Sequence, residues 1–80
     1  MNIKNHIVNR IKELCNGKGI SIHQLARLSN ISPSTLYNIT KSKNQDISIL
    51  TIKKLCDGLG ISIIDFFDTD TFRCSEQEIR

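Results

Sequence analysis

The side chains best suited to chemistry in this sequence lie in one short stretch, NISPSTLYNITKSK, residues 30–43. They carry hydroxyl, amide and ammonium groups, which exchange hydrogen bonds but lack the base and acid that activate a catalytic nucleophile. If the stretch is helical, Leu36 and Ile39 stand three positions apart and can both face a core. The polar residues that then lie on the other faces are Ser34, Thr35, Tyr37, Asn38 and Lys41. Such an array favours recognition through hydrogen bonds.

Catalysis, cofactor binding and metal binding are poorly supported elsewhere in the chain. The Gly17–Gly19 segment lacks both the spacing of a phosphate-binding loop and a strand before it. The three cysteines form no C-x-x-C pair, and His6 and His23 have no partners at ligand spacing, so both histidines are expected at the surface. We therefore expect no enzyme, no cofactor and no metal site.

The composition predicts one small domain in a reducing compartment. A chain of 80 residues buries a modest core and leaves little room for a deep catalytic cleft. Three cysteines without a pairing pattern are typical of free thiols in the cytoplasm. No charged-then-apolar leader and no run of 18 apolar residues occurs, so neither a signal peptide nor a membrane span is expected.

Charge is distributed unevenly between the two halves. Residues 1–45 hold seven Lys and Arg against one Glu, a net charge of +6, whereas residues 46–80 hold four against seven acids, a net charge of −3. A one-sided positive field attracts phosphate polyanions. The alternative is a solvated surface with a chance asymmetry.

An Ile-Ser pair marks each of four expected helix starts. The four serines are suited to capping a first helical turn, and they are Ser21, Ser32, Ser48 and Ser62. Four residues after each serine comes an apolar residue that can pack on the preceding isoleucine as a hydrophobic staple, namely Leu25, Leu36, Ile52 and Phe66. Gln24 completes a capping box with Ser21, and Pro33 fits a first helical position.

The apolar spacing predicts five helices and no strand. The first helix begins at Ile3 and ends near Asn16-Gly17, and Ile49 is among the inward residues of the fourth. The expected ranges of the later helices are 22–29, 32–40, 49–58 and 63–68. We expect one domain over residues 1–68 and a polar tail over residues 69–80, in which Phe72 is the exception.

The segment SIHQLARLSNISPSTLYNIT, residues 21–40, carries a family resemblance. It places the small Ala26 in one helix, a tight turn at residues 30–32 and a second helix anchored by apolar residues. This resembles the helix-turn-helix of the lambda-repressor-like proteins, the Cro/C1-type or XRE-type transcriptional regulators. The segment DISILTIKKLCDGLGISIIDFF, residues 46–67, is similar to the family's closing helices.

The resemblance covers residues 3–68 and implies an all-α fold. It implies a compact five-helix lambda-repressor-like DNA-binding domain, in which the second and third helices form the helix-turn-helix. The chain departs from the family at Asn30, where Gly is usual, and at Ile22, where a phosphate-contacting Gln is common. Residues 40–43 also replace an acidic-x-Gly ending and make the end of the third helix more basic.

By this resemblance, residues 32–40 form a recognition helix that enters the major groove of double-stranded DNA. The residues expected to contact bases are Ser34, Thr35, Tyr37 and Asn38. The residues expected to contact phosphates are Ser21, Gln24, Lys41, Lys43, Asn44 and Gln45. Asn38 has the strongest claim, since Asn is a poor mid-helix residue that can pair with adenine. The alternatives are that Tyr37 covers the core edge and that the lysines serve solubility.

The last expected helix holds more apolar residues than one face can bury. We expect a homodimer joined there, and the residues expected at its interface are Ile64, Phe66, Phe67 and Phe72. Two recognition helices would then read a near-palindromic operator, and the protein would regulate transcription as a repressor. The alternative is an antitoxin or other protein-binding module, whose main partner would be a second protein.

Overall fold

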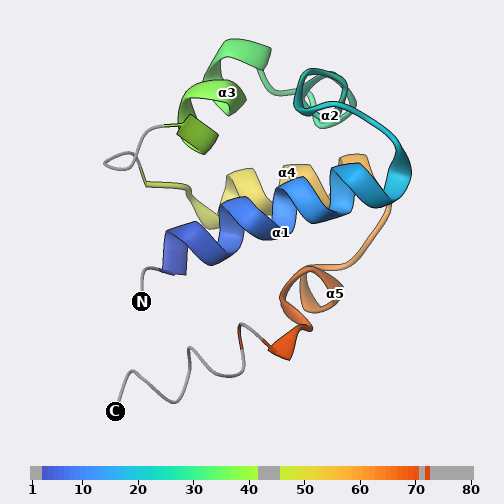
Figure 1. Cartoon of the computed structure of the whole chain (residues 1–80). Coiled ribbons are helices and arrows are strands. Elements are labelled where there is room, and N and C mark those ends of the chain that lie inside the picture. Colours follow the sequence, from blue (N-terminus) through green and yellow to red (C-terminus); the bar gives the residue numbers. More distant parts are fainter. Residues whose placement is uncertain (1–2, 42–45, 71, 73–80) are drawn as a thin grey trace.

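The computed structural model describes residues 3–41, 46–70 and 72. Over these residues the chain forms five helices and no strand (Figure 1). Their bounds are α1 Ile3–Lys18, α2 Ile22–Leu28, α3 Pro33–Lys41, α4 Ile49–Leu59 and α5 Ile63–Phe67. The predicted all-α, five-helix fold is confirmed.

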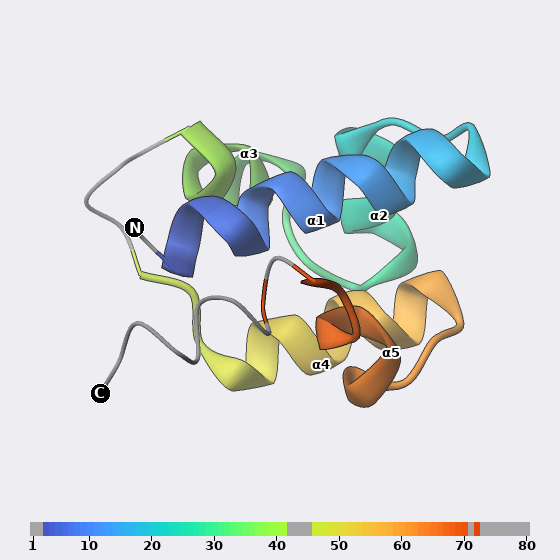
Figure 2. The same cartoon turned by 60° about the horizontal axis from the view of Figure 1, so that its bottom comes forward.

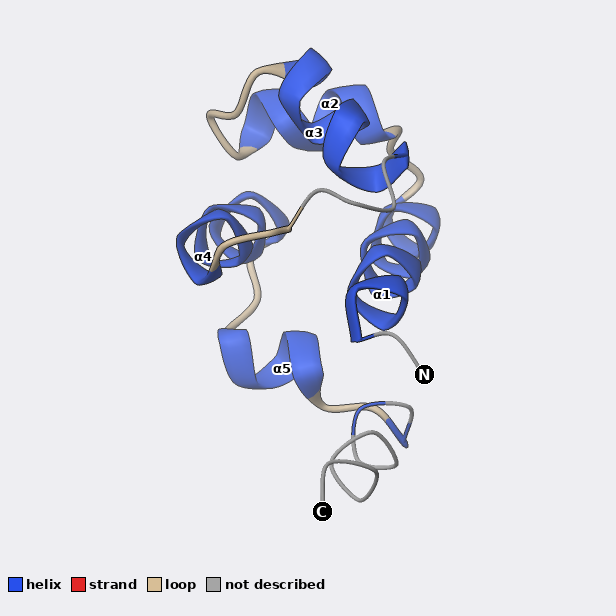
Figure 3. Cartoon of the chain, turned by 90° about the vertical axis from the view of Figure 1, so that its left-hand side faces the viewer, coloured by secondary structure: helices blue, strands red, loops and turns tan. Residues whose placement is uncertain are grey.

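The helices lie in three levels. α1 and α4 form the middle level, α2 and α3 lie on one side of it, and α5 lies on the opposite side (Figures 1 and 3). Figure 2 shows α5 beside α4, which it contacts. The surface of the α2–α3 pair and the surface of α5 are therefore at opposite ends of the molecule.

Serine hydroxyls start three of the four later helices as predicted. Ser21, Ser48 and Ser62 each accept a hydrogen bond from a backbone N–H of the first turn, at 3.1, 3.1 and 3.0 Å. Ser32 differs, because its hydroxyl lies 3.1 Å from the hydroxyl of Ser34. All four apolar residues that follow the serines are buried, and the preceding isoleucines pack against the same core.

The turns depend on residues with positive φ. α1 continues through Gly17 to Lys18, one residue past the expected end at Asn16-Gly17, and Gly19 at φ 67° then supplies the left-handed position. Asn30 adopts φ 58° between α2 and α3, as its residue type predicts. This single left-handed residue reverses the chain quickly enough for α3 to pack directly on α2.

Close approach of α4 to the end of α2 fixes the position of the helix pair. Ala26 is completely buried, and a Cβ atom added at Gly58 would lie 2.3 Å from Ser29 Oγ and 3.1 Å from the Leu28 carbonyl carbon. No side chain therefore fits at position 58 without movement. Ser29 Oγ is buried and has no hydrogen-bonding partner among the described residues.

The aromatic residues near α5 close the core instead of forming an open surface. Phe66 is 0 % exposed and Phe72 is 6 % exposed, and Phe67 packs edge-on against each ring at 4.9 Å between centroids. Phe66 and Phe72, which the sequence analysis placed at the dimer interface, are therefore buried within the folded chain and offer little surface to a second copy. Packing continues to Phe72, past the expected domain boundary at residue 68.

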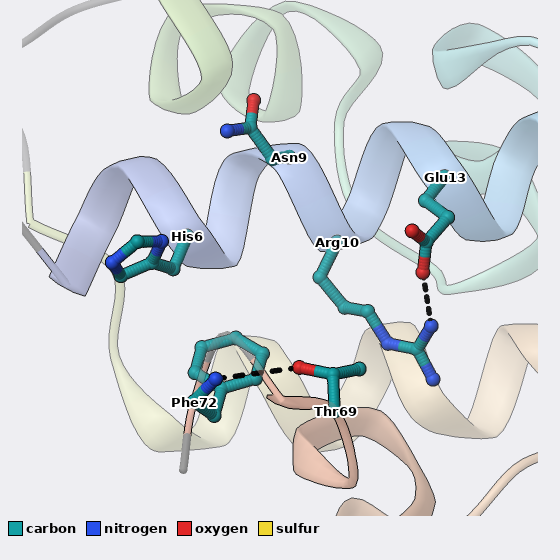
Figure 4. A pocket seen from close by; sticks show the side chains of 6 residues that line it. All are labelled: His6, Asn9, Arg10, Glu13, Thr69 and Phe72. Carbon is teal, nitrogen blue, oxygen red and sulfur yellow. Dashed lines mark hydrogen bonds and ion pairs between the residues drawn. The ribbon is translucent and has the colours of Figure 1, made fainter. Parts of the chain in front are cut away.

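Arg10 fastens the end of α5 to α1. Its Nε donates a hydrogen bond to the Phe66 carbonyl at 2.8 Å, and its Nη2 donates one to the Asp65 carbonyl at 2.9 Å. An ion pair with Glu13 holds the same guanidinium, as Figure 4 shows. The last carbonyls of a helix have no partner within it, and this cation supplies a donor to the Phe66 carbonyl and a second donor to the Asp65 carbonyl, which also accepts from the Asp68 N–H at 3.3 Å. The positive charge also complements the partial negative charge of these carbonyls.

Two further expectations about single residues are wrong. His6 is 7 % exposed, because Phe72 packs against its ring with 6.2 Å between centroids (Figure 4). Ile49 is 64 % exposed, because it lies in the first turn of α4, one turn before the buried stripe that starts at Ile52.

Candidate nucleic-acid interface

Two buried side chains set the orientation of α3. Leu36 is 0 % exposed and Ile39 is 4 % exposed, and Pro33 is half-buried at the start of the helix. The opposite side of the helix faces solvent. The exposed residues on it are Ser34, Thr35, Tyr37, Asn38 and Lys41, which are the residues singled out from the sequence.

Asn38 is the residue on this face best placed to read a base edge. Its side chain is exposed and takes part in no hydrogen bond within the described part of the chain, so its donor and acceptor both remain for a ligand. Ser34 is one turn earlier on the same side, and its hydroxyl shares a hydrogen bond with that of Ser32. The two side chains present hydrogen-bonding groups along one line of the helix.

Tyr37 and Lys41 form the far end of the same face. The Tyr37 side chain is exposed, and the Lys41 ammonium lies 5.4 Å from the centre of its ring, a cation–π contact. The alternative in which Tyr37 covers the core edge is thus disfavoured, since the residue is 56 % exposed. The contact holds a positive charge over an exposed aromatic ring.

The capping box at the start of α2 leaves donors available on both of its side chains. The Ser21 N–H donates to Gln24 Oε1 at 2.9 Å, and the Gln24 N–H donates to Ser21 Oγ at 3.1 Å. Each side chain uses an acceptor atom in the box. The Ser21 hydroxyl proton and the Gln24 amide protons remain to donate to an outside acceptor such as a phosphate oxygen.

A shallow hollow of about 250 Å³ lies where the start of α2 meets α3. The residues that line this α2–α3 hollow are Ile22, His23, Pro33, Ser34, Tyr37 and Asn38. Sequence reasoning did not assign Ile22, His23 or Pro33 to the recognition surface. The available signal in the sequence was Ile22, which stands where the family commonly has Gln. The sequence did not show that the turn between α2 and α3 places Ile22 and Pro33 at the same hollow.

The electrostatic character of the α2–α3 pair is set by a long acid-free segment. No Asp or Glu occurs between Glu13 and Asp46, so both helices carry only neutral and basic side chains. A second groove, of about 360 Å³, runs between α1 and the end of α3 and is lined by basic and amide residues, including Lys12 and Lys41. The surface around α3 therefore favours a polyanion.

Other chemistry finds little support in the described residues. Burial raises the pKa of the Cys15 and Cys56 thiols, which keeps them protonated and unreactive near neutral pH. Among the described residues no group of three His, Cys, Asp or Glu side chains is placed to hold a metal ion, and none of the described helices is long and apolar enough to cross a membrane. Lys43, Asn44 and Gln45 lie outside the described residues.

Comparisons with known proteins agree with this geometry. A family model described as a Cro/C1-type HTH DNA-binding domain matches residues 10–71. The structure is similar to the crystal structure of the prophage Lp1 protein 11, with a TM-score of 0.79 and 28 % sequence identity over 89 % of this chain and 93 % of the other. The comparison with curated proteins gave no match.

Proposed function

This chain belongs to the Cro/C1-type helix-turn-helix DNA-binding domain family, and we propose that it is a sequence-specific regulator of transcription that acts as a repressor. The observation that carries the proposal is the exposed face of α3, where Ser34 and Asn38 stand one turn apart on a helix pair without acidic residues. α3 enters the major groove, and its buried Leu36 and Ile39 hold it rigidly to the domain.

The proposed DNA contacts fall into two groups: phosphate contacts that position the domain on the duplex, and base contacts that read the sequence. Ser21, Gln24 and Lys41 donate to phosphate oxygens on the two sides of the groove and fix the register of the helix. Asn38 then pairs with an adenine through both its amide groups, while Ser34, Thr35 and Tyr37 contact neighbouring base edges. Lys43, Asn44 and Gln45 follow α3 in the sequence and extend the proposed phosphate contacts.

We propose that the protein binds DNA as a homodimer on a near-palindromic operator. Of the residues predicted for the dimer contact, Ile64 is 79 % exposed and Phe67 is half-buried, so these two remain available to a second copy. A dimer places two copies of α3 on successive turns of one DNA face, and a repressor acts by occupying that DNA.

A protein-binding module is the second candidate. Ile49 and Leu50 are 64 % and 62 % exposed next to each other at the start of α4, away from the buried stripe of that helix. A large contiguous apolar patch marks a contact with another protein, and these two residues would contribute to such a patch. In this case the main partner would be a second protein, as for an antitoxin.

The test is selection of bound duplexes from a random pool at two salt concentrations. The proposal predicts a short inverted repeat, with binding that weakens steeply as salt rises because phosphate contacts release counterions. Sedimentation of the protein with the selected duplex should give two chains per duplex. A pool that yields no motif at either salt concentration would contradict sequence-specific binding and favour the protein-binding module.

A further inference from the structure

The α2–α3 hollow is apolar at its centre although it lies on a polar surface. Ile22 and Pro33 are half-buried, and Ile22 packs against the core from the first turn of α2. The exposed ring of Tyr37 forms another wall. Because carbon atoms line the hollow and the core supports Ile22, the hollow is a fixed apolar site within the proposed reading surface.

The surroundings of the hollow select the kind of molecule that fills it. Asn38 and Ser34 line the hollow with hydrogen-bonding groups, and the ammonium of Lys41 lies over the Tyr37 ring. Neither α2 nor α3 contributes an acid. The occupant therefore presents a small apolar group beside hydrogen-bonding atoms and carries negative charge around them.

DNA offers one group of that description in the major groove. The C5 methyl of thymine is the apolar group on the base edges, and it stands beside the O4 acceptor and opposite the adenine that an asparagine can pair with. We propose that the α2–α3 hollow holds a thymine methyl, so that Ile22 and Pro33 specify a thymine in each half-site next to the base read by Asn38. The inference rests on the proposed function and adds a named base contact to it.

The test removes the methyl and changes nothing else. In the selected duplex, each thymine is replaced in turn by deoxyuridine, which lacks only the C5 methyl. At one position per half-site the wild-type affinity should fall about four-fold, the effect of losing one buried carbon group. At the same position, 5-methylcytosine should bind more tightly than cytosine.

A matched pair of variants assigns the methyl to this hollow. Ile22→Gln replaces an apolar wall by the residue common in the family and should bind the thymine and deoxyuridine duplexes equally well. Leu28→Gln changes an exposed residue of the same helix outside the hollow and should keep the four-fold difference. Circular dichroism of both variants should match the wild type, because neither residue lies in the buried core.

Two results would overturn the inference. If every deoxyuridine duplex binds like its thymine counterpart while a motif is still selected, the regulator stands and the thymine contact is absent. If Ile22→Gln keeps the same preference for thymine as the wild type, the methyl is read elsewhere. Absence of any selected motif would instead remove the proposed function itself, and the hollow would then be a site for an apolar side chain of a second protein.

Discussion

A Cβ atom at position 58 would approach Ser29 Oγ to 2.3 Å and two backbone carbons to 3.1 Å. Gly58→Ala should therefore lower the free energy of unfolding by about 1–3 kcal/mol, the usual effect of overpacking. Ser29→Ala should recover part of this loss, because it deletes the nearest atom and leaves the backbone contacts. Urea denaturation of the single and double variants measures both effects.

Gly17→Ala is the control for the glycine substitution. Gly17 lies inside α1, and a Cβ atom there would meet nothing within 4 Å. Alanine should stabilise the protein by about 0.5–1 kcal/mol at this position, since it lowers the entropy of the unfolded chain. Equal effects of alanine at positions 17 and 58 would refute the close approach of α4 to α2.

Single-residue burial was predictable where a local pattern determines it. Leu36 and Ile39 follow the helical period behind a marked start, so their burial and the exposure of Asn38 could both be predicted. His6 could not be predicted, because its cover is Phe72, which comes from the other end of the chain. Nothing in the residues next to His6 signals that contact.

At the scale of elements, Phe72 fastens the chain after α5 to the core. Phe72→Ala should lower the free energy of unfolding by about 3–5 kcal/mol, because the ring is buried among other aromatic rings. Ile64→Ala, which truncates a side chain that is 79 % exposed, should change the unfolding midpoint little in dilute protein. Thermal unfolding of the two variants gives the comparison. Similar midpoints for both would mean that Phe72 contributes no packing.

Helix starts were easier to predict than helix ends. Each of the four later helices is preceded by an Ile-Ser pair and has a staple residue, a signal contained within six residues. The end of α1 was misplaced because two glycines, Gly17 and Gly19, both permit a left-handed residue, and the packing of Ile20 on the core favours the later one. The segment after α5 has a single aromatic residue in polar sequence, which gives no periodic signal.

At the scale of the whole molecule, the two buried thiols should make the free energy of unfolding decrease at alkaline pH. Burial raises the pKa of the Cys15 and Cys56 thiols in the folded state. Their contribution to the free energy of unfolding is therefore complete below the pKa of the unfolded state and is lost as pH rises through the pKa of the folded state. The free energy of unfolding should thus fall as pH rises above the ordinary thiol pKa of about 8.5. The Cys15→Ala and Cys56→Ala double variant should show a smaller fall over this range in urea titrations. An unchanged slope would assign the dependence to other groups.

The helices themselves could be predicted from the sequence, but their arrangement in three levels could not. The family resemblance implied the α2–α3 pair, and the side of α3 that it assigns to base reading is exposed in the structure. It could not show that the rings of Phe66 and Phe67 pack against each other. These residues belong to α5, which lies at the end of the molecule opposite to α2 and α3 (Figure 3). That packing leaves Ile64 and Phe67 as the remaining parts of the predicted dimer contact.

The central claim is that Asn38 on α3 reads a base. The most direct measurement is a double-mutant cycle in which wild-type protein and Asn38→Ala each bind the selected duplex and a duplex altered at one adenine per half-site. The claim predicts that Asn38→Ala loses about 1–3 kcal/mol on the selected duplex and little on the altered one. Asn16→Ala, a change at an exposed asparagine of α1, should leave both affinities unchanged. If Asn38→Ala discriminates between the two duplexes as well as the wild type does at every adenine, α3 does not read DNA in this way.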